Sequence, residues 1–320
     1  MRLVKNLCRI IVGIVFIYSG FVKGIDPLGS DYKFTDYFNA FGMGWMNATT
    51  LFFSFALSLA EFLIGIALLF NLWVSRMAWG SLLFMAFFTP LTLVLALTNP
   101  VSDCGCFGDA MILTNWQTFW KNIILLLLAI MIFVYRKEYK SSLPLVGQFS
   151  FLALAGAGML CLSVYCYRHL PVLDFRPYAV GKNITEGMRL PEGTEPDQYE
   201  VTLKYKNKQT GEVQSFTEEN YPWQDTLNWE YESSSERLVK KGYITPIHDL
   251  VIEHPTLGNI TEEILEDDNH TILAVAYNLT QSDVQYQPAI NRLAEYAQEK
   301  GIRFYGLTSS SERDIETYKK

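Results

Sequence analysis

Five apolar stretches constrain the fold of this chain more than any other feature of its sequence. A helix needs about 20 apolar residues to cross the hydrocarbon core of a bilayer. With their flanks, five segments reach that length: Leu7–Val22, Leu51–Leu72, Val74–Leu97, Phe119–Tyr135 and Phe149–Tyr167. All five lie within the first 168 of 320 residues. The sequence therefore predicts an α-helical membrane bundle, made of a four-helix core and a fifth transmembrane helix.

The first stretch has an alternative interpretation as a cleaved signal peptide over Met1–Gly24. A small-residue cleavage pattern is missing, and the stretch continues through Tyr18, Ser19 and Lys23. We therefore expect it to remain in the protein as a membrane helix.

The charge of the chain changes at the end of the apolar half. Residues 1–168 carry a net charge of +4 and residues 169–320 a net charge of −11, within an overall −7. Basic residues form only short clusters beside the apolar stretches, which argues against binding of nucleic acid. Only 18% of the residues are charged, and their uneven distribution excludes a single soluble enzyme.

Lysine and arginine in the short loops predict the orientation of the bundle. They gather at or just before the start of the first stretch, between the second and third, and between the fourth and fifth: Arg2, Lys5, Arg9, Arg76, Arg136, Lys137 and Lys140. We expect these loops and the N-terminus in the cytoplasm, with the bundle in a bacterial inner membrane. Five crossings then place the loop Thr98–Gln117 and residues 169–320 in the periplasm.

The expected domain organisation has four segments. A transmembrane bundle occupies residues 1–140, and the fifth transmembrane helix lies within 141–168. A connector rich in Gly and Pro follows over 169–197. Residues 198–320 form a soluble periplasmic domain, for which we expect an α+β or α/β fold.

The beginning of the soluble domain has the pattern of a β-hairpin. Gln198–Tyr205 alternates between apolar and polar residues, Lys208–Gly211 is typical of a turn, and Val213–Phe216 is the expected partner strand. Trp223 and Trp229 are expected to be packing residues.

The end of the domain predicts a β-α-β-α order. Thr271–Tyr277 and Ile302–Leu307 are the expected strands, and the helix Val284–Lys300 between them ends at Gly301. Another helix follows, with Ser309 or Ser310 as its cap. A helical crossover predicts a parallel pair of strands.

Residues 271–320 therefore resemble part of a thioredoxin-like or peroxiredoxin-like fold. A redox-active thioredoxin has Cys-x-x-Cys after its strand, whereas Asn278–Asp283 contains no cysteine. The resemblance implies a scaffolding module rather than a redox centre in this domain.

Two cysteines lie in the loop expected outside the membrane. Cys104 and Cys106 enclose Gly105, in a compartment where disulfides persist. A disulfide across one residue is tight, Gly tolerates such a turn, and strained disulfides are easily reduced. These features favour an exchanging redox pair. A purely structural loop and a metal site completed by Asp103 and Asp109 are the alternatives.

The other cysteines lie in predicted helices. Cys166 is close to the outer end of the fifth stretch, at the depth expected for the Cys104 loop. It is a candidate resolving partner, with a small packing residue as the alternative. Cys8 and Cys161 are expected to pack.

Glu61 is the only carboxylate in any predicted crossing. An ionisable side chain at that depth is a candidate functional residue, because its desolvation is costly. A structural hydrogen bond to a neighbouring helix is the alternative. Lys23 is expected to extend to the interface or to approach Asp26. Pro90 is expected to kink the third helix and to make room for a ligand.

Three of these segments carry a family resemblance: Tyr18–Lys23 followed by Asp26 and Pro27, then Glu61–Gly65, then Cys104–Gly108. Their order and spacing resemble the DoxX-like superfamily, and particularly its MauE-type (methylamine utilisation) branch. The added fifth helix and acidic outer domain are similar to DoxX-type proteins of Bacteroidetes.

The resemblance implies thiol chemistry at the outer membrane face. MauE-type proteins are linked to maturation of a disulfide-rich dehydrogenase subunit, and other DoxX-like proteins to quinone-coupled sulfur oxidation. A quinone is therefore the expected cofactor, with Ser19, Lys23 and Glu61 as its expected binding residues. Cys104, Cys106, Cys166 and Glu61 are the expected catalytic residues.

Three function classes follow from the sequence. The leading hypothesis is a membrane thiol–disulfide redox protein that acts on a periplasmic protein partner. The competing one is a non-enzymatic anchor or scaffold, so the sequence leaves open whether the chain is an enzyme. A transporter ranks below both, because the sequence has no evident inverted repeat.

Overall fold

The computed structural model describes residues 2–101, 103–195, 198–217, 220–223, 225–240, 242–243, 245–248, 250–267, 269–282 and 284–318. Ser102 and Asp283, which belong to segments interpreted above, lie outside these ranges. The chain divides into two compact units, Met1–Val180 and Gly181–Lys320.

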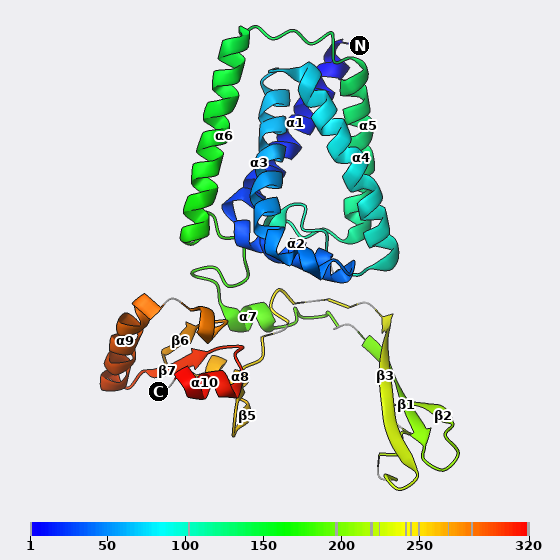
Figure 1. The fold of residues 1–320 in the computed structure, drawn as a ribbon, viewed down its shortest axis with the longest axis vertical. Coiled ribbons are helices and arrows are strands. Elements are labelled where there is room, and N and C mark those ends of the chain that lie inside the picture. Colours follow the sequence, from blue (N-terminus) through cyan, green and yellow to red (C-terminus); the bar gives the residue numbers. More distant parts are fainter. Residues whose placement is uncertain are drawn as a thin grey trace. The chain divides into compact units, whose positions relative to one another are not determined.

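Five long helices dominate the first unit (Figure 1). They are α1 (Arg2–Ile25), α3 (Thr50–Leu69), α4 (Val74–Thr98), α5 (Asn115–Val134) and α6 (Leu145–Arg168). All five are long and apolar enough to cross a membrane, which confirms the prediction of five membrane-type helices. α4 continues through Pro90.

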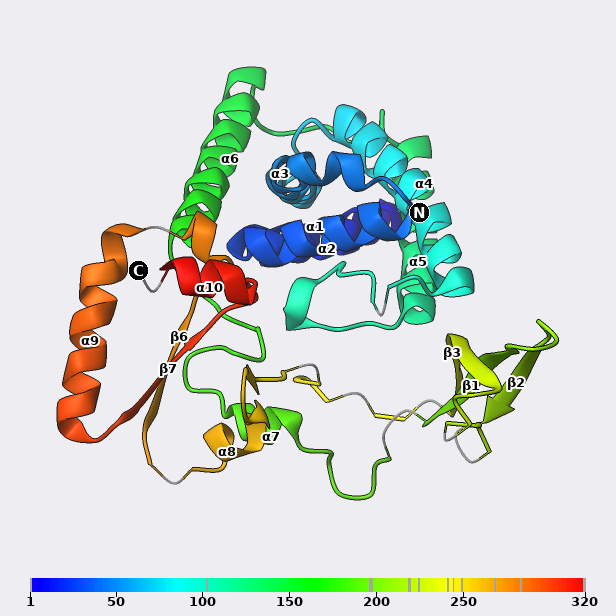
Figure 2. The same ribbon diagram turned by 60° about the horizontal axis from the view of Figure 1, so that its bottom comes forward.

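A further helix, α2 (Pro27–Ala40), lies between the first two membrane-type helices, where the sequence analysis expected no helix. The side chain of Asp26 caps it by accepting a hydrogen bond of 3.0 Å from Gly29 N, and Pro27 takes the first helical position. A short 3₁₀ helix, η1 (Gly44–Thr49), follows. α2 packs on α3 and lies across one end of the bundle (Figures 1 and 2).

Glycines bring α1 and α3 into backbone contact. A Cβ atom at Gly20 would lie 2.5 Å from Phe62 N and 2.6 Å from Ser58 O. One at Gly65 would lie 2.5 Å from Ile17 N. Small residues at such crossings allow helices in a membrane to approach closely. The α1–α3 pair is therefore a closely packed element that fixes the positions of the side chains beyond these glycines.

Polar side chains join α4 to α5. Asn122 Nδ2 donates to Thr92 Oγ1 at 3.2 Å, and Asn115 Nδ2 donates to Asn99 Oδ1 at 2.9 Å. Thr114 begins α5 with a reciprocal cap to Gln117. These contacts hold the loop between the two helices at both of its ends.

The second unit begins with α7 (Ile184–Met188) and contains a three-stranded antiparallel sheet in the order β2-β1-β3. Its strands are β1 (Gln198–Asn207), β2 (Val213–Thr217) and β3 (Trp229–Lys240). The predicted hairpin is confirmed, whereas β3 was not predicted because its serines and glutamates lack a regular apolar alternation. Trp229 packs edge-on against Phe216 at 5.2 Å. Trp223 is 61% exposed, so the prediction that it packs is wrong.

The remaining elements of this unit are short: β4 (Glu253–His254), β5 (Gly258–Asn259), α8 (Thr261–Leu265), β6 (Thr271–Val275), η3 (Leu279–Gln281), η4 (Val284–Tyr286), α9 (Gln287–Lys300), β7 (Arg303–Leu307) and α10 (Glu312–Tyr318). β6 and β7 pair in parallel, as predicted. Gly301 ends α9 with a φ of 67°.

The cap of α10 differs from the prediction. Ser311 Oγ accepts a hydrogen bond of 3.3 Å from Asp314 N, so Ser311 caps the helix. Ser309 and Ser310 instead bind the chain after β6, where Ser309 Oγ donates to Tyr277 O at 2.6 Å and Ser310 Oγ accepts from Leu279 N at 2.9 Å.

Candidate functional site

The two cysteines of the Cys-Gly-Cys loop face each other. Cys104 Sγ and Cys106 Sγ lie 3.1 Å apart, and Gly105 between them has a φ of 61°. Asp103 fixes this turn, because its Oδ1 accepts from Gly105 N at 2.8 Å while its Oδ2 lies 2.7 Å from Lys33 Nζ. The loop therefore holds the two thiols close enough for a disulfide bond to form between them.

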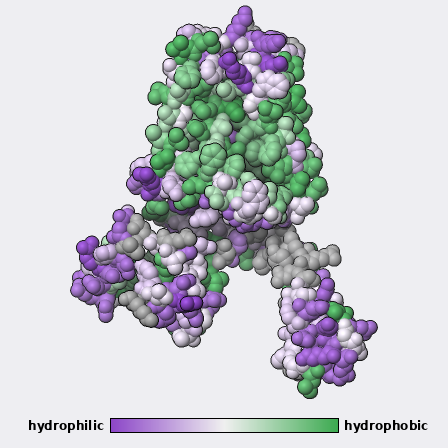
Figure 3. Space-filling model, viewed as in Figure 1, coloured by the Kyte–Doolittle hydropathy of each residue, from purple (hydrophilic) through white to green (hydrophobic). Residues whose placement is uncertain are grey.

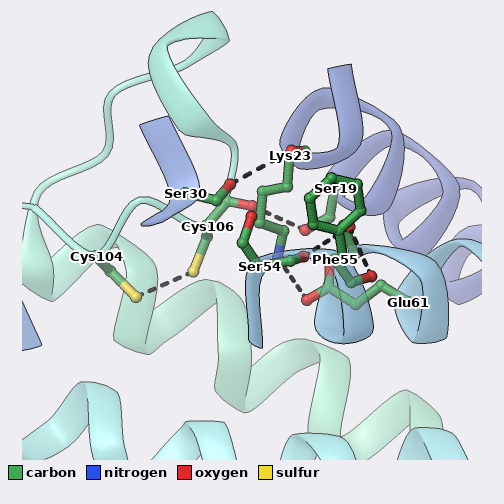
Figure 4. Close-up of polar contacts among 9 residues, drawn as sticks. Ser19, Lys23, Ser30, Ser54, Phe55, Glu61, Cys104 and Cys106 are labelled. Atoms are coloured by element: carbon green, nitrogen blue, oxygen red, sulfur yellow. Dashed lines mark hydrogen bonds and ion pairs between the residues drawn. The ribbon is translucent and has the colours of Figure 1, made fainter. Parts of the chain in front are cut away.

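Two hydroxyl groups hold the loop to the helices. Tyr37 Oη of α2 donates to Cys104 O at 2.5 Å, and Ser19 Oγ of α1 donates to Cys106 O at 2.8 Å. Figure 4 shows Ser19 beside Cys106. Lys33 and Tyr37, which the sequence analysis missed, are four residues apart on one face of α2. That spacing would have revealed them if the helix had been recognised.

Lys23 and Glu61 form a buried ion pair beside the loop. Lys23 Nζ lies 2.6 Å from Glu61 Oε1 and 2.5 Å from Oε2, and the two residues are 9% and 4% exposed. The predictions that Lys23 extends to the interface or approaches Asp26 are therefore wrong. The α1–α3 contact brings Lys23 to the buried carboxylate, and Asp26 caps α2 instead.

The protonation of the two thiols is unequal. The hydrogen bond from Cys104 lowers the pKa of Cys106 to about 6, and the charges of Lys121 and Lys23 act in the same direction against the effect of burial. The same hydrogen bond, together with burial, raises the pKa of Cys104. Near neutral pH the pair therefore consists of a Cys106 thiolate and a Cys104 thiol that donates to it.

Tyr37 stays a hydrogen-bond donor. Burial is the main cause that raises the pKa of its phenol, and the neighbouring Cys104 adds to the effect. The hydroxyl is thus protonated over the whole physiological range and keeps its bond to Cys104 O.

These residues line one cavity in the bundle, which is partly open to the surface. Its charged, polar and thiol side chains include Ser19, Lys23, Tyr37, Glu61, Cys104, Cys106, Lys121 and Asn122. Its apolar walls include Val15, Phe16, Leu57, Phe84, Met85, Phe88 and Leu91. The cavity thus brings together five of the six candidate residues from the sequence.

Cys166, the sixth candidate, is buried in α6 and does not line this cavity. Cys8 is buried with its Sγ 3.4 Å from Met131 Sδ, whereas Cys161 is exposed on α6 and does not pack as predicted. Among the described residues, no group of three or more His, Cys, Asp or Glu is placed to hold a metal ion.

Five membrane-type helices, four of which (α1, α3, α4 and α5) line this cavity, define an integral membrane protein. Residues 1–135 match the family model of methylamine utilisation protein MauE. The matched segment contains α1–α5 and every residue that lines the cavity. Residues 199–241 match a domain of unknown function (DUF8463), which covers the three-stranded sheet. No curated protein and no solved structure matches the chain.

Proposed function

We propose that the protein is a membrane thiol–disulfide oxidoreductase in which Cys104 and Cys106 are the redox pair and a membrane quinone is the electron acceptor. The observation that carries this proposal is the 3.1 Å separation of the two sulfur atoms at the wall of a cavity, and the lowered pKa of Cys106 supports it. A disulfide bond is about 2.05 Å long, so roughly 1 Å of movement forms it.

The loop is held in place without a disulfide. Lys33, Tyr37 and Ser19 all bind it through contacts that do not involve sulfur. A purely structural bond between Cys104 and Cys106 would therefore add little to its order. This independence supports a bond that forms and breaks.

The oxidised loop would exchange its disulfide with two thiols of a periplasmic protein. A partner thiolate attacks one sulfur of the oxidised pair, the Cys104–Cys106 bond breaks, and a mixed disulfide forms. A second partner thiolate then resolves it, so the partner gains a disulfide. The loop gains two electrons and two protons and returns to the dithiol.

Reoxidation of the loop removes two electrons and two protons from Cys104 and Cys106. A bound quinone would accept the two electrons and the two protons and would be reduced to the quinol. The residues of the cavity suit such a group, because apolar side chains line it together with the charged and hydroxyl side chains of Lys23, Glu61 and Ser19. Glu61, held against Lys23 in the same cavity, would receive one of the two protons.

We also propose that the redox loop faces the periplasm. The loops after α1 and α4 and the chain after α6 leave the bundle at one end, because five helices alternate in direction. Most juxtamembrane basic residues belong to the other end, where Lys5 binds Glu138. The second unit would then be periplasmic, and the β6–α9–β7 order supports a thioredoxin-like module that contacts the partner.

Thiol trapping in intact cells tests this function. Alkylation after acid quenching should show an oxidised Cys104–Cys106 pair in cells with quinone and a reduced pair when quinone synthesis is blocked. Cys161→Ser is the matched control, since its thiol lies outside the cavity. A pair that stays reduced under all growth conditions, or Cys104→Ser and Cys106→Ser variants that behave as wild type, would refute the proposal.

A non-enzymatic scaffold is the second candidate. The observation that favours it is the separate family match of residues 199–241, which marks the three-stranded sheet as a module distinct from the segment that matches MauE. A stable envelope partner that is captured equally well by the Cys104→Ser/Cys106→Ser variant would support this alternative.

A further inference from the structure

The cavity lies between two helices that separate. α3 packs mainly on α1, whereas α4 packs mainly on α5. The two helices are close at the turn of residues 70–73 and diverge toward α2 (Figures 1 and 2). Leu57 and Glu61 on α3 and Phe84, Phe88 and Leu91 on α4 all line the cavity. The diverging helices therefore form two facing walls.

The exposure of the apolar walls changes with depth. Phe16 and Met85 are buried at the inner side, whereas Leu57, Phe88 and Leu91 are half-buried. The half-buried residues belong to the spans Gly44–Leu69 and Val74–Thr98. Surface within such spans contacts lipid acyl chains rather than water. The apolar edge of the cavity thus faces the bilayer.

An aromatic wall connects that edge with the interior. The rings of Phe88 and Phe84 stack at 4.4 Å, and Phe84 packs edge-on against buried Phe16 at 5.3 Å. Phe34 of α2 adds a half-buried ring to the same lining. The face of the bundle seen in Figure 3 is largely hydrophobic, and Phe52 of α3 and Leu83 and Phe87 of α4 are exposed.

We infer that the cavity is loaded sideways from the bilayer, through a mouth framed by Phe34, Leu57, Phe88 and Leu91. Its ligand is an electron acceptor with a flat polar head and a long apolar tail. This inference rests on the proposed function and specifies its acceptor. The head would lie beside Lys23, and the tail would extend between α3 and α4 into the acyl chains.

The chemistry of the lining favours this ligand over a water-soluble one. Entry through the mouth keeps a tail in apolar surroundings, whereas a charged acceptor would lose its hydration among Phe84, Phe88 and Leu91. The polar groups lie at the far end of the aromatic wall. A ligand with one polar end and one apolar end matches this change from apolar to polar lining.

Photolabelling tests the mouth without turnover. The full chain in liposomes is irradiated with a quinone that carries a diazirine on its isoprenoid tail, and the adducts are mapped by mass spectrometry. We expect adducts near Leu57, Phe88 and Leu91 that an excess of unlabelled long-tailed quinone suppresses. Adducts spread evenly over exposed lipid-facing residues such as Leu127 and Leu154, without competition, would overturn the inference.

Variants that fill the mouth provide the second test. Leu57→Trp and Leu91→Trp should lower competed labelling and the rate of Cys104–Cys106 oxidation by long-tailed quinone about tenfold. Leu127→Trp on the exposed face of α5 is the matched control and should stay within about twofold of wild type. Losses that are equal in the control and in the mouth variants would contradict a lateral mouth.

A quinone without a tail separates the two proposals. It should oxidise the Cys104–Cys106 pair in every variant, which also shows that the variants are folded. If no quinone oxidises the wild-type pair while labelling at the mouth persists, the proposed function fails and the mouth stands. If the pair is oxidised but labelling misses α3 and α4, the mouth fails and the function stands.

Discussion

Lys23 Nζ of α1 lies 2.6 Å from Glu61 Oε1 of α3, and both side chains are buried in the bundle. The two residues are 38 positions apart in the sequence, yet each is the other's charge partner. Their pairing joins the helix that holds Ser19 to the helix that lines the opposite side of the cavity.

Removal of one partner of this pair should destabilise the bundle strongly. Lys23→Met leaves the Glu61 carboxylate buried and uncompensated, which costs about 3–5 kcal/mol. The double variant Lys23→Met/Glu61→Leu should recover most of the loss, because no buried charge remains. Thermal unfolding in detergent, followed by tryptophan fluorescence, measures Lys23→Met, Glu61→Leu and the double variant. Losses that simply add in the double variant would show that the two side chains are not coupled.

The glycine contact between α1 and α3 should be equally sensitive. Gly20→Ala places a Cβ atom 2.5 Å from Phe62 N, so the helices must separate, at a cost of about 1–3 kcal/mol. Gly158→Ala on α6 is the control, because nothing lies within 4 Å of its added Cβ atom. We expect a lower unfolding temperature for the first variant and an unchanged or higher one for the second. Equal behaviour of the two would contradict backbone contact at Gly20.

The reactivity of Cys106 should follow the pKa of about 6 that its surroundings produce. Iodoacetamide reacts with the thiolate, so its rate should rise with pH to a plateau, with a midpoint near that value. Cys104→Ala removes the hydrogen bond that lowers the pKa most, and the midpoint should move up toward the ordinary thiol value. Cys104→Ser retains a donor and should move it less. A midpoint that is the same in all three proteins would exclude Cys104 as the cause.

The lowered pKa of Cys106 also makes the stability of the fold depend on pH. The folded-state pKa of Cys106 lies below its unfolded value of about 8.5, so the thiolate stabilises the fold most fully above the unfolded value. That contribution decreases as the pH falls and is lost through about 6. Unfolding of the Cys106→Ala variant should therefore depend less on pH between these two values than that of wild type.

Tyr37 should control the mobility of the loop. Tyr37→Phe removes the bond to Cys104 O, which contributes about 1 kcal/mol, and alkylation of Cys104 should become faster. Tyr32→Phe is the matched control on the same helix, because Tyr32 is 65% exposed. Equal alkylation rates in both variants would mean that the loop is held by Lys33 and Ser19 alone.

The helices were predictable from the sequence because the thickness of a bilayer requires long apolar runs. All five expected stretches are helices in the structure. α2 was missed because it has no such run, although Asp26 and Pro27 form a helix-start signal. β3 was missed for a similar reason, since antiparallel pairing with β1 rather than its own alternation positions it.

The candidate site was partly predictable. Cys104, Cys106, Ser19, Lys23 and Glu61 were all selected from the sequence, and one cavity contains them. Which of them touch was not predictable, because the Lys23–Glu61 distance depends on how closely α1 approaches α3. The contributions of Lys33 and Tyr37 depend on α2, so no local pattern in the Cys-Gly-Cys loop could reveal them.

The buried ion pair also has a consequence for how the chain enters the membrane. Ribosomes release α1 before α3, so Lys23 is already in the bilayer when Glu61 arrives. Lys23 lies near the end of its helix, where a long side chain can reach the headgroups while it waits. Glu61 lies in the interior of its helix and has no such exit. Lys23, which can reach the headgroups without a partner, is therefore inserted first. Glu61, which needs a partner in the bilayer interior, is inserted when Lys23 is already present.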